Sequence, residues 1–126
     1  MPVFHLNKQL KFPPVQLSEP DGLLAEGGDL SVERLLLAYR SGIFPWYDEP
    51  PILWWSPDPR FVLFPDELKV SASMKQVLKK QQFRISFNED FAAVIARCSS
   101  IPREGQAGTW ITPEMQEAYT RLHKAG

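Results

Sequence analysis

Residues 42–60 read GIFPWYDEPPILWWSPDPR, and this stretch decides how the chain is interpreted. It contains three of the four tryptophans and five of the twelve prolines. Proline fixes φ and removes a backbone donor, so we expect a stiff and mostly non-helical segment. Its aromatic faces suit the stacking of planar groups such as nucleobases. They equally suit the pinning together of a small domain, and on this pattern alone both interpretations stay open.

The bulk composition is that of an ordinary globular protein. The chain has 126 residues, of which 44% are hydrophobic and 23% charged, which fits one domain or one domain with a small subdomain. A formal net charge of -1 means that any contact with a nucleic acid needs a local basic patch. The single cysteine, Cys98, excludes an internal disulfide and is expected to be an inert core residue. No apolar run is long enough to span a bilayer, and the first ten residues lack a signal peptide's apolar core, so we expect a cytoplasmic protein.

The first helix has clear start and stop signals. Residues before about Glu26 are expected to be irregular, and Gly27-Gly28-Asp29 to form a turn that follows no strand. Ser31 is a suitable N-cap and Gly42 a suitable C′ residue. The apolar spacing between them predicts a helix whose buried stripe consists of Leu30, Leu35, Leu36, Ala38 and Tyr39.

The second half of the chain is expected to be more regular. We predict strands over 60–64 and 83–87, and helices over 71–82, from 88 or 89 to 98, and from 113 to about 124. Thr112 would cap the last helix, with Pro113 at its first position. The inward-facing side chains are expected to be Met74, Val77 and Leu78 in the first of these helices and Phe91, Val94 and Ile95 in the second. This order predicts an α/β or α+β fold whose remaining strands are missing from the chain, because two strands are too few for a stable sheet.

The familiar catalytic signatures are absent from the sequence. There is no Walker loop and no Ser/His/Asp or Cys/His arrangement. His5 and His123 lie far apart, and with one cysteine they make no metal site of familiar spacing. What remains as a candidate site is aromatic and basic.

Several features of the chain are candidates for binding, and most of them have a structural alternative. Trp46 follows a Phe-Pro pair that fixes its direction. Trp110 precedes a helix N-terminus, where free N–H groups suit an anion, but it would equally serve as a hydrophobic staple. Tyr119 is either part of a site or a half-buried core residue. The exposed lysine face of 71–82 is either simply solvated or a contact for phosphate; it consists of Lys75, Lys79 and Lys80. Arg60 and Arg103 lie beside the aromatic segments and are candidates of the same kind.

The chain resembles the leucyl/phenylalanyl-tRNA–protein transferase family over nearly its whole length. The resemblance rests on long, ordered strings that are rich in rare residues: PDGLLA at 20–25, GGDLS at 27–31, AYRSGIFPW at 38–46, PILWWSPDPR at 51–60 and GTWITPEM at 108–115.

The resemblance implies both a fold and a reaction. The implied fold is α+β, with a small N-terminal α+β subdomain over 1–60 followed by the first part of an acetyltransferase-like (GNAT-related) domain over 61–126. The implied activity is that of an aminoacyltransferase, which moves Leu or Phe from Leu-tRNA or Phe-tRNA to the N-terminal Arg or Lys of an acceptor protein and so marks it for degradation. The ester of an aminoacyl-tRNA is already activated, so the resemblance implies no cofactor and no metal.

The family's site residues carry over to three positions. Trp46 and Trp110 match aromatic positions near the terminal adenosine of the tRNA, and Tyr119 matches a tyrosine near the aminoacyl end. Lys75, Lys79 and Lys80 stand where relatives carry basic residues and are candidate phosphate contacts. No catalytic residue is identifiable within this chain, because the family's acidic and amide residues lie beyond Gly126. We therefore expect the chain alone to be inactive and prone to association.

Two other functions remain open on the sequence. One is a non-catalytic RNA-binding module built from the aromatic stretch and the lysine face, which would bind tRNA with a steep salt dependence and without transfer. The other is a protein-interaction module whose proline-aromatic groove accepts a peptide.

Overall fold

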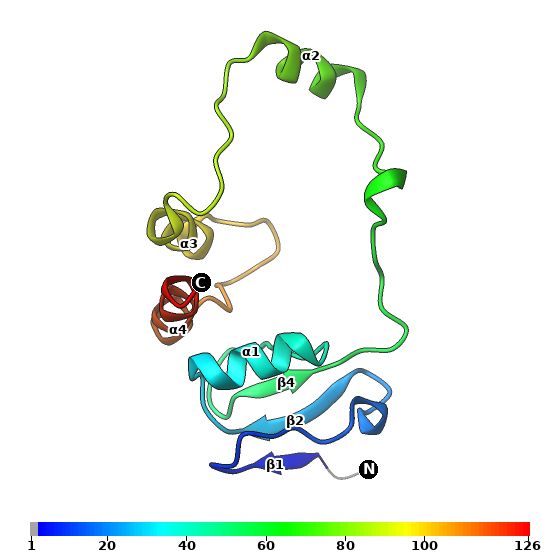
Figure 1. The fold of residues 1–126 in the computed structure, drawn as a ribbon, viewed down its shortest axis with the longest axis vertical. Helices are drawn as coiled ribbons and strands as arrows, with labels where there is room; N and C mark the ends of the chain where they lie inside the picture. Colours follow the sequence, from blue (N-terminus) through cyan, green and yellow to red (C-terminus); the bar gives the residue numbers. More distant parts are fainter. Residues whose placement is uncertain (1–2) are drawn as a thin grey trace. The chain divides into compact units, whose positions relative to one another are not determined.

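The computed structural model describes residues 3–126 and divides into two compact units. Among the described residues, the first unit comprises 3–58 together with Phe91–Gly126, and the second comprises Pro59–Asp90. Helices and short strands occur together along the chain (Figure 1), so the expected α+β class is confirmed.

A small mixed sheet forms the base of the first unit. Its strands are β1 (Phe4–Leu6), β2 (Leu23–Gly27), β3 (Phe44–Pro45) and β4 (Leu53–Trp55), in the spatial order β1-β2-β4-β3. β1 runs parallel to β2, whereas β4 runs antiparallel to both β2 and β3. The prediction of irregular structure before about Glu26 was wrong for β1 and β2, because these short strands pair with partners far along the chain and carry little local signal. The glycine pair therefore does follow a strand, since β2 ends at Gly27.

The first helix, α1 (Val32–Arg40), begins and ends where the sequence predicts. The Ser31 hydroxyl accepts a hydrogen bond from the Arg34 backbone N–H at 3.2 Å, which satisfies one free donor of the first turn. The chain leaves the helix at Gly42, whose φ of +74° suits a residue without a side chain. Leu35 and Ala38 are buried as expected. Tyr39 is 50% exposed, however, so its placement in the buried stripe was wrong.

The core of the first unit is centred on Trp54, which is fully buried. Its indole Nε1 donates to the Gly27 carbonyl at 2.9 Å, and the Phe12 ring meets it edge-on with the centroids 5.0 Å apart. The pinning role that the sequence left open therefore applies to Trp54. The other buried apolar residues of this core are Leu24, Ala25, Leu30, Leu35, Ala38, Ile43, Tyr47, Met115 and Ala118.

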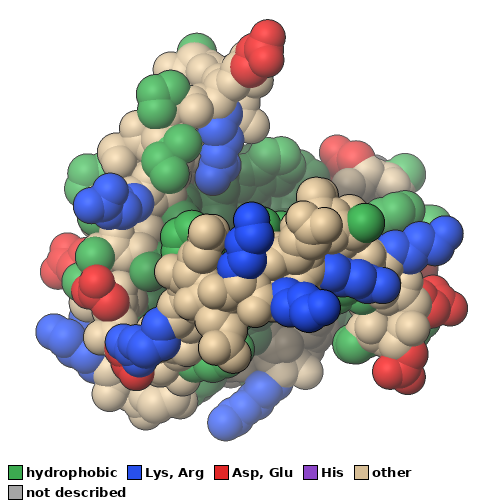
Figure 2. All heavy atoms as spheres, turned by 90° about the horizontal axis from the view of Figure 1, so that it is seen from above, with side chains coloured by type: hydrophobic (Ala, Val, Ile, Leu, Met, Phe, Trp, Pro, Cys, Tyr) green, Lys and Arg blue, Asp and Glu red, His purple; other side chains and the backbone are tan. Residues whose placement is uncertain are grey.

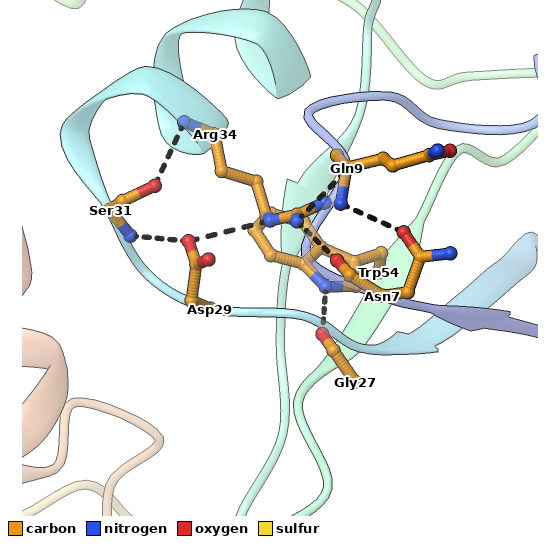
Figure 3. A network of polar contacts seen from close by, with 7 residues as sticks. All are labelled: Asn7, Gln9, Gly27, Asp29, Ser31, Arg34 and Trp54. Carbon is orange, nitrogen blue, oxygen red and sulfur yellow. Dashed lines mark hydrogen bonds and ion pairs between the residues drawn. The ribbon is translucent and has the colours of Figure 1, made fainter.

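A buried arginine ties the N-terminal segment to α1 (Figure 3). Arg34 is 1% exposed, and its Nη2 donates to the carbonyls of Asn7 and Gln9 at 2.8 and 3.2 Å. Its Nε lies 3.4 Å from the Asp29 carboxylate, and the pKa of Asp29 is lowered mainly by a hydrogen bond from Ser31. Because a buried charge is stable only when it is paired and hydrogen-bonded, this network fixes the path of the chain around α1.

Two further helices complete the first unit. They are α3 (Phe91–Ser100) and α4 (Pro113–Lys124), and α1 lies between the sheet and α4 (Figure 1). Thr112 caps α4 as predicted, accepting from the Met115 N–H at 3.3 Å. α3 packs on α4 through the stacked rings of Phe91 and His123, whose centroids are 4.7 Å apart. Val94 was expected inside but is 56% exposed, because the contact with α4 covers only one side of α3.

The second unit consists of a short 3₁₀ helix (Pro65–Glu67) and α2 (Ala72–Lys80), which Ser71 caps. The strands predicted over 60–64 and 83–87 are not formed, because no neighbouring strand within residues 3–126 pairs with them. The predicted inward orientation of Met74, Val77 and Leu78 was also wrong, since all three are exposed.

Across the part of the chain that the structure describes, no helix is long and apolar enough to cross a bilayer.

Candidate aromatic binding site

An apolar hollow of about 430 Å³ opens on the first unit. Four segments build it: the last turn of α1 supplies Tyr39, β3 supplies Phe44 and Pro45, the residue after β3 is Trp46, and Trp110 precedes α4. Residues that lie up to 71 positions apart therefore meet at one place. The structure thus brings together Trp46 and Trp110, which the sequence singled out separately.

Trp46 is both exposed and held in place. Its backbone N–H donates to the Leu53 carbonyl at 2.9 Å, which ties it to β4. Its own carbonyl accepts from the Trp55 indole at 2.7 Å, and the two rings are tilted against each other with centroids 6.0 Å apart. The side chain is nevertheless 53% exposed. A large apolar ring on a fixed backbone offers a stacking surface with little loss of conformational entropy.

Trp110 is partly buried and packs against the core while lining the hollow. The Thr112 N–H donates to its carbonyl at 3.0 Å, which holds the residue against the start of α4. Its position therefore agrees with both roles that the sequence left open: a hydrophobic staple at the start of the helix, and a side chain that lines a ligand site. A single ring can serve both purposes, because only one of its faces is needed for packing.

Tyr119 reaches the same region through Tyr39. The two phenolic oxygens are 2.6 Å apart, and the rings meet edge-on with centroids 6.3 Å apart. Burial, reinforced by the hydrogen bond with Tyr39, raises the pKa of Tyr119 well above its ordinary value, so this hydroxyl keeps its proton. One of the two hydroxyl protons is used between the tyrosines, which leaves the other available for an acceptor atom of a ligand.

Tyr39 is a site residue that the sequence did not reveal. Its position in the apolar pattern of α1 indicated burial. Only the fold places Tyr39 beside Trp46, Trp110 and Tyr119, because these residues come from three other segments.

A second hollow, of about 450 Å³, shares Trp46 and Trp110 with the first. The rest of its lining is Asp48 and the loop Gln106–Thr109, which mixes polar side chains with Ala107 and Gly108. The next residue after Trp46, Tyr47, is buried, and its hydroxyl donates to the Glu114 carboxylate at 3.4 Å. Burial and the charge of Glu114 raise the pKa of Tyr47 from 10.0 to about 12.

The lysine face belongs to the second unit. Lys75, Lys79 and Lys80 are exposed on α2, as the sequence predicts. In the space-filling view, basic side chains gather in the foreground with apolar side chains among them (Figure 2). Within residues 3–126, no group of three or more His, Cys, Asp or Glu residues is arranged to hold a metal ion.

Comparison with known proteins gives two adjoining matches to family models. The model described as leucyl/phenylalanyl-tRNA protein transferase matches residues 62–126, which is more than half of the chain. The model of that protein's N-terminal domain matches residues 28–58. This chain belongs to the leucyl/phenylalanyl-tRNA protein transferase family. The resemblance inferred from the aromatic strings is thereby confirmed.

Individual members of the transferase family are similar along the whole chain. A leucyl/phenylalanyl-tRNA–protein transferase of Syntrophobacter fumaroxidans is 61% identical over 127 residues, covering 100% of this chain and 54% of that protein. Its counterpart in Syntrophus aciditrophicus is 59% identical, with 53% of that protein covered. The Flavobacterium johnsoniae protein is 57% identical over 125 residues, with 59% of it covered. The chain therefore spans about half the length of the curated relatives it matches.

Proposed function

We propose that this chain contributes the tRNA-binding part of a transferase that moves Leu or Phe from aminoacyl-tRNA to the N-terminal Arg or Lys of an acceptor protein. The name carried by its relatives supports the reaction class. The observation that carries the proposal is the apolar hollow between Trp46 and Trp110, with the Tyr39–Tyr119 pair at its side. As part of the same proposal, the modified acceptor is marked for degradation and the reaction takes place in the cytoplasm.

The aromatic hollow suits the terminal adenosine of an aminoacyl-tRNA. A base stacked on Trp46 and Trp110 would be fixed without readout of its sequence, because every base has a flat face. Fixing the adenosine also fixes the ester that it carries, so the reacting carbonyl is oriented before the acceptor arrives. The free proton of the Tyr39–Tyr119 pair is a donor for an oxygen of that ester or of its ribose.

The reaction itself is a simple acyl transfer. The acceptor's α-amine attacks the ester carbonyl carbon, a C–N bond forms, and the C–O bond to the ribose breaks. The ribose oxygen leaves with a proton that originates on the amine. No oxidation or reduction takes place, so the protein must position the two reactants and stabilise the oxyanion. We assign none of these catalytic steps to a residue of this chain.

The lysine face and the domain division belong to the proposal as well. Lys75, Lys79 and Lys80 present three charges along one face of α2, which suits the phosphates of a tRNA acceptor stem. We further propose that the functional domains divide at residues 60 and 61, between the ranges that the two family models match.

The test is a binding and transfer experiment with labelled Leu-tRNA. Trp46→Ala and Trp110→Ala should each weaken binding about tenfold, since stacking on an aromatic side chain is worth about 1–3 kcal/mol per base. Phe4→Ala is the matched control: it removes an exposed aromatic ring of the same unit from β1, outside the hollow, and should leave binding unchanged. Transfer of the label is followed on a peptide that begins with Arg and on one that begins with Ala.

The outcomes separate the candidate functions. Label on the Arg peptide alone would establish a transferase within these 126 residues. Binding that depends on both tryptophans, without transfer, agrees with a tRNA-binding portion whose chemistry needs further residues. Binding that the two tryptophan variants leave unchanged would overturn the proposed site.

A further inference from the structure

The two tryptophans of the aromatic hollow come from segments that are far apart in the chain. Trp46 follows β3, and its N–H donates to the Leu53 carbonyl at 2.9 Å. Trp110 follows residues 101–109, every one of which is exposed, so its support comes from the core and from the start of α4. The gap between the two rings therefore depends on how the start of α4 is held against the segment that follows β3.

One hydrogen bond joins these two places directly. Tyr47, the residue after Trp46, is 5% exposed, and its hydroxyl donates to the Glu114 carboxylate at 3.4 Å. Glu114 is the second residue of α4 and comes shortly after Trp110 in the chain. Neither Tyr47 nor Glu114 lines either of the two hollows. The pair thus lies outside the site and still links the segments that carry its two tryptophans.

Short, hydrogen-bonded connections join this pair to each ring. Tyr47 and Trp46 are adjacent, and the Trp46 carbonyl accepts from the Trp55 indole at 2.7 Å. On the other side, the Thr112 N–H donates to the Trp110 carbonyl at 3.0 Å, just before the helix that carries the acceptor. A shift of either member of the pair is therefore passed on to the neighbouring tryptophan.

The Tyr47 hydroxyl is committed to this contact. A buried hydroxyl that loses its partner costs free energy, so the folded chain keeps the hydrogen bond to Glu114. Burial first, and then the charge of Glu114, raise the pKa of Tyr47 to about 12, so the proton that it donates is present at neutral pH.

We propose that Tyr47 and Glu114 are positioning residues, which set the gap between Trp46 and Trp110 without touching the ligand. The inference rests on the proposed function and deepens it, because it assigns the geometry of the stacking site to a pair outside that site. A base contacts both rings only when their separation suits it. A gap that is fixed in advance avoids the cost of ordering the rings on binding.

A double-mutant cycle in the affinity for adenosine tests the inference. Adenosine is titrated into the whole chain, and the NMR shifts of the tryptophan indole N–H groups report binding. Tyr47→Phe removes one oxygen and keeps the ring, whereas Glu114→Ala removes the acceptor. Each should weaken binding about threefold, a modest loss because a hydrogen bond of 3.4 Å is long. The double variant should bind no more weakly than either single variant, because both changes remove the same interaction.

Two further variants and a stability measurement separate positioning from folding. Glu114→Gln keeps an acceptor oxygen and should bind adenosine as the unmodified chain does. Glu117→Ala is the matched control, because it removes an exposed carboxylate of the same helix that pairs with Arg121, and it should leave the affinity unchanged. Urea unfolding without ligand is measured for each variant. A residue that acts on stability alone would shift the unfolding midpoint and leave the affinity of the folded chain unchanged.

The outcomes distinguish this inference from the proposed function. An unchanged affinity in both Tyr47→Phe and Glu114→Ala would overturn the positioning role and leave the stacking site in place. A loss of about ninefold in the double variant, the product of two independent effects, would overturn the hydrogen bond as their common cause. A Glu114→Gln variant as weak as Glu114→Ala would do the same. If adenosine does not shift the indole signals of Trp46 and Trp110 in the unmodified chain, the stacking site of the proposed function fails together with this inference.

Discussion

Gly22 occupies a position that suits glycine alone. Its φ is +99°, and a Cβ added there would lie 2.8 Å from the Cα of Pro57. Its N–H donates to Glu19 and its carbonyl accepts from Ser56, both at 2.8 Å, so the backbone has no freedom to move aside. We expect Gly22→Ala to lower the free energy of unfolding by about 2–4 kcal/mol, because backbone strain and overpacking add. Urea unfolding followed by tryptophan fluorescence measures this loss.

The variant Gly42→Ala separates the cost of the positive φ from the cost of the close contact. Gly42 has a φ of +74°, but an added Cβ would meet nothing within 4 Å. We therefore expect a smaller loss, about 1 kcal/mol, from the unfavourable φ alone. Equal losses in the two variants would show that the close approach to Pro57 contributes nothing.

Single residues were predictable from the sequence where their partners are local. Ser31 and Thr112 were identified as N-caps because a cap bonds to an N–H three residues further on. The burial of Arg34 was not foreseen, since the carbonyls that hold it belong to Asn7 and Gln9, at least 25 residues away. Tyr39 was wrongly predicted to be buried for the same reason. The apolar pattern of α1 does not show that this residue lines a hollow instead of packing into the core.

The same distinction holds for whole elements. The helices follow the sequence closely because capping, periodicity and terminal glycine all act within one segment. Residues 83–87 alternate as a strand should, but a strand exists only when another strand pairs with it. β3 and β4 lie within the proline-rich stretch, for which the prolines predicted only a stiff and mostly non-helical segment. They are strands because they pair with each other, and β4 also pairs with β2.

Two helix caps of identical chemistry allow the coupling of each helix to the core to be measured. Ser31 accepts from the Arg34 N–H and Ser71 from the Met74 N–H, both at 3.2 Å. We expect Ser31→Ala to lower the free energy of unfolding by about 1 kcal/mol, because α1 carries part of the buried core. Ser71→Ala should leave that free energy unchanged, because no residue of α2 is buried.

Hydrogen exchange shows where the loss of the Ser71 cap acts. The amides of Ala72–Lys80 should exchange faster in Ser71→Ala, while those of α1 keep their protection, as local opening without global unfolding requires. All four tryptophans lie in the first unit, so their fluorescence reports its unfolding alone. A shift of the tryptophan unfolding midpoint in Ser71→Ala would contradict the independence of α2.

At the scale of the whole molecule, the second unit carries apolar side chains that no packing covers. Phe61, Phe83 and Phe87 are 103%, 76% and 84% exposed, and further exposed apolar residues lie between them. Monomeric proteins rarely leave so much apolar surface in contact with water. The segments around these rings also have the alternation and β-propensity that favour pairing with another strand.

We therefore expect the isolated chain to self-associate through residues 61–87, as measured by sedimentation velocity over a wide concentration range. Burying a Phe side chain is worth about 1.5–3 kcal/mol, so replacing both Phe61 and Phe87 by Asp should raise the dissociation constant about tenfold or more. Leu17→Asp, which places the same charge on an exposed apolar residue of the first unit, should leave association unchanged. Association that Leu17→Asp weakens as much as the double variant does would place the contact outside this segment. A chain that stays monomeric at every concentration would mean that the apolar side chains of 61–87 find cover within the same molecule, since water alone does not stabilise them.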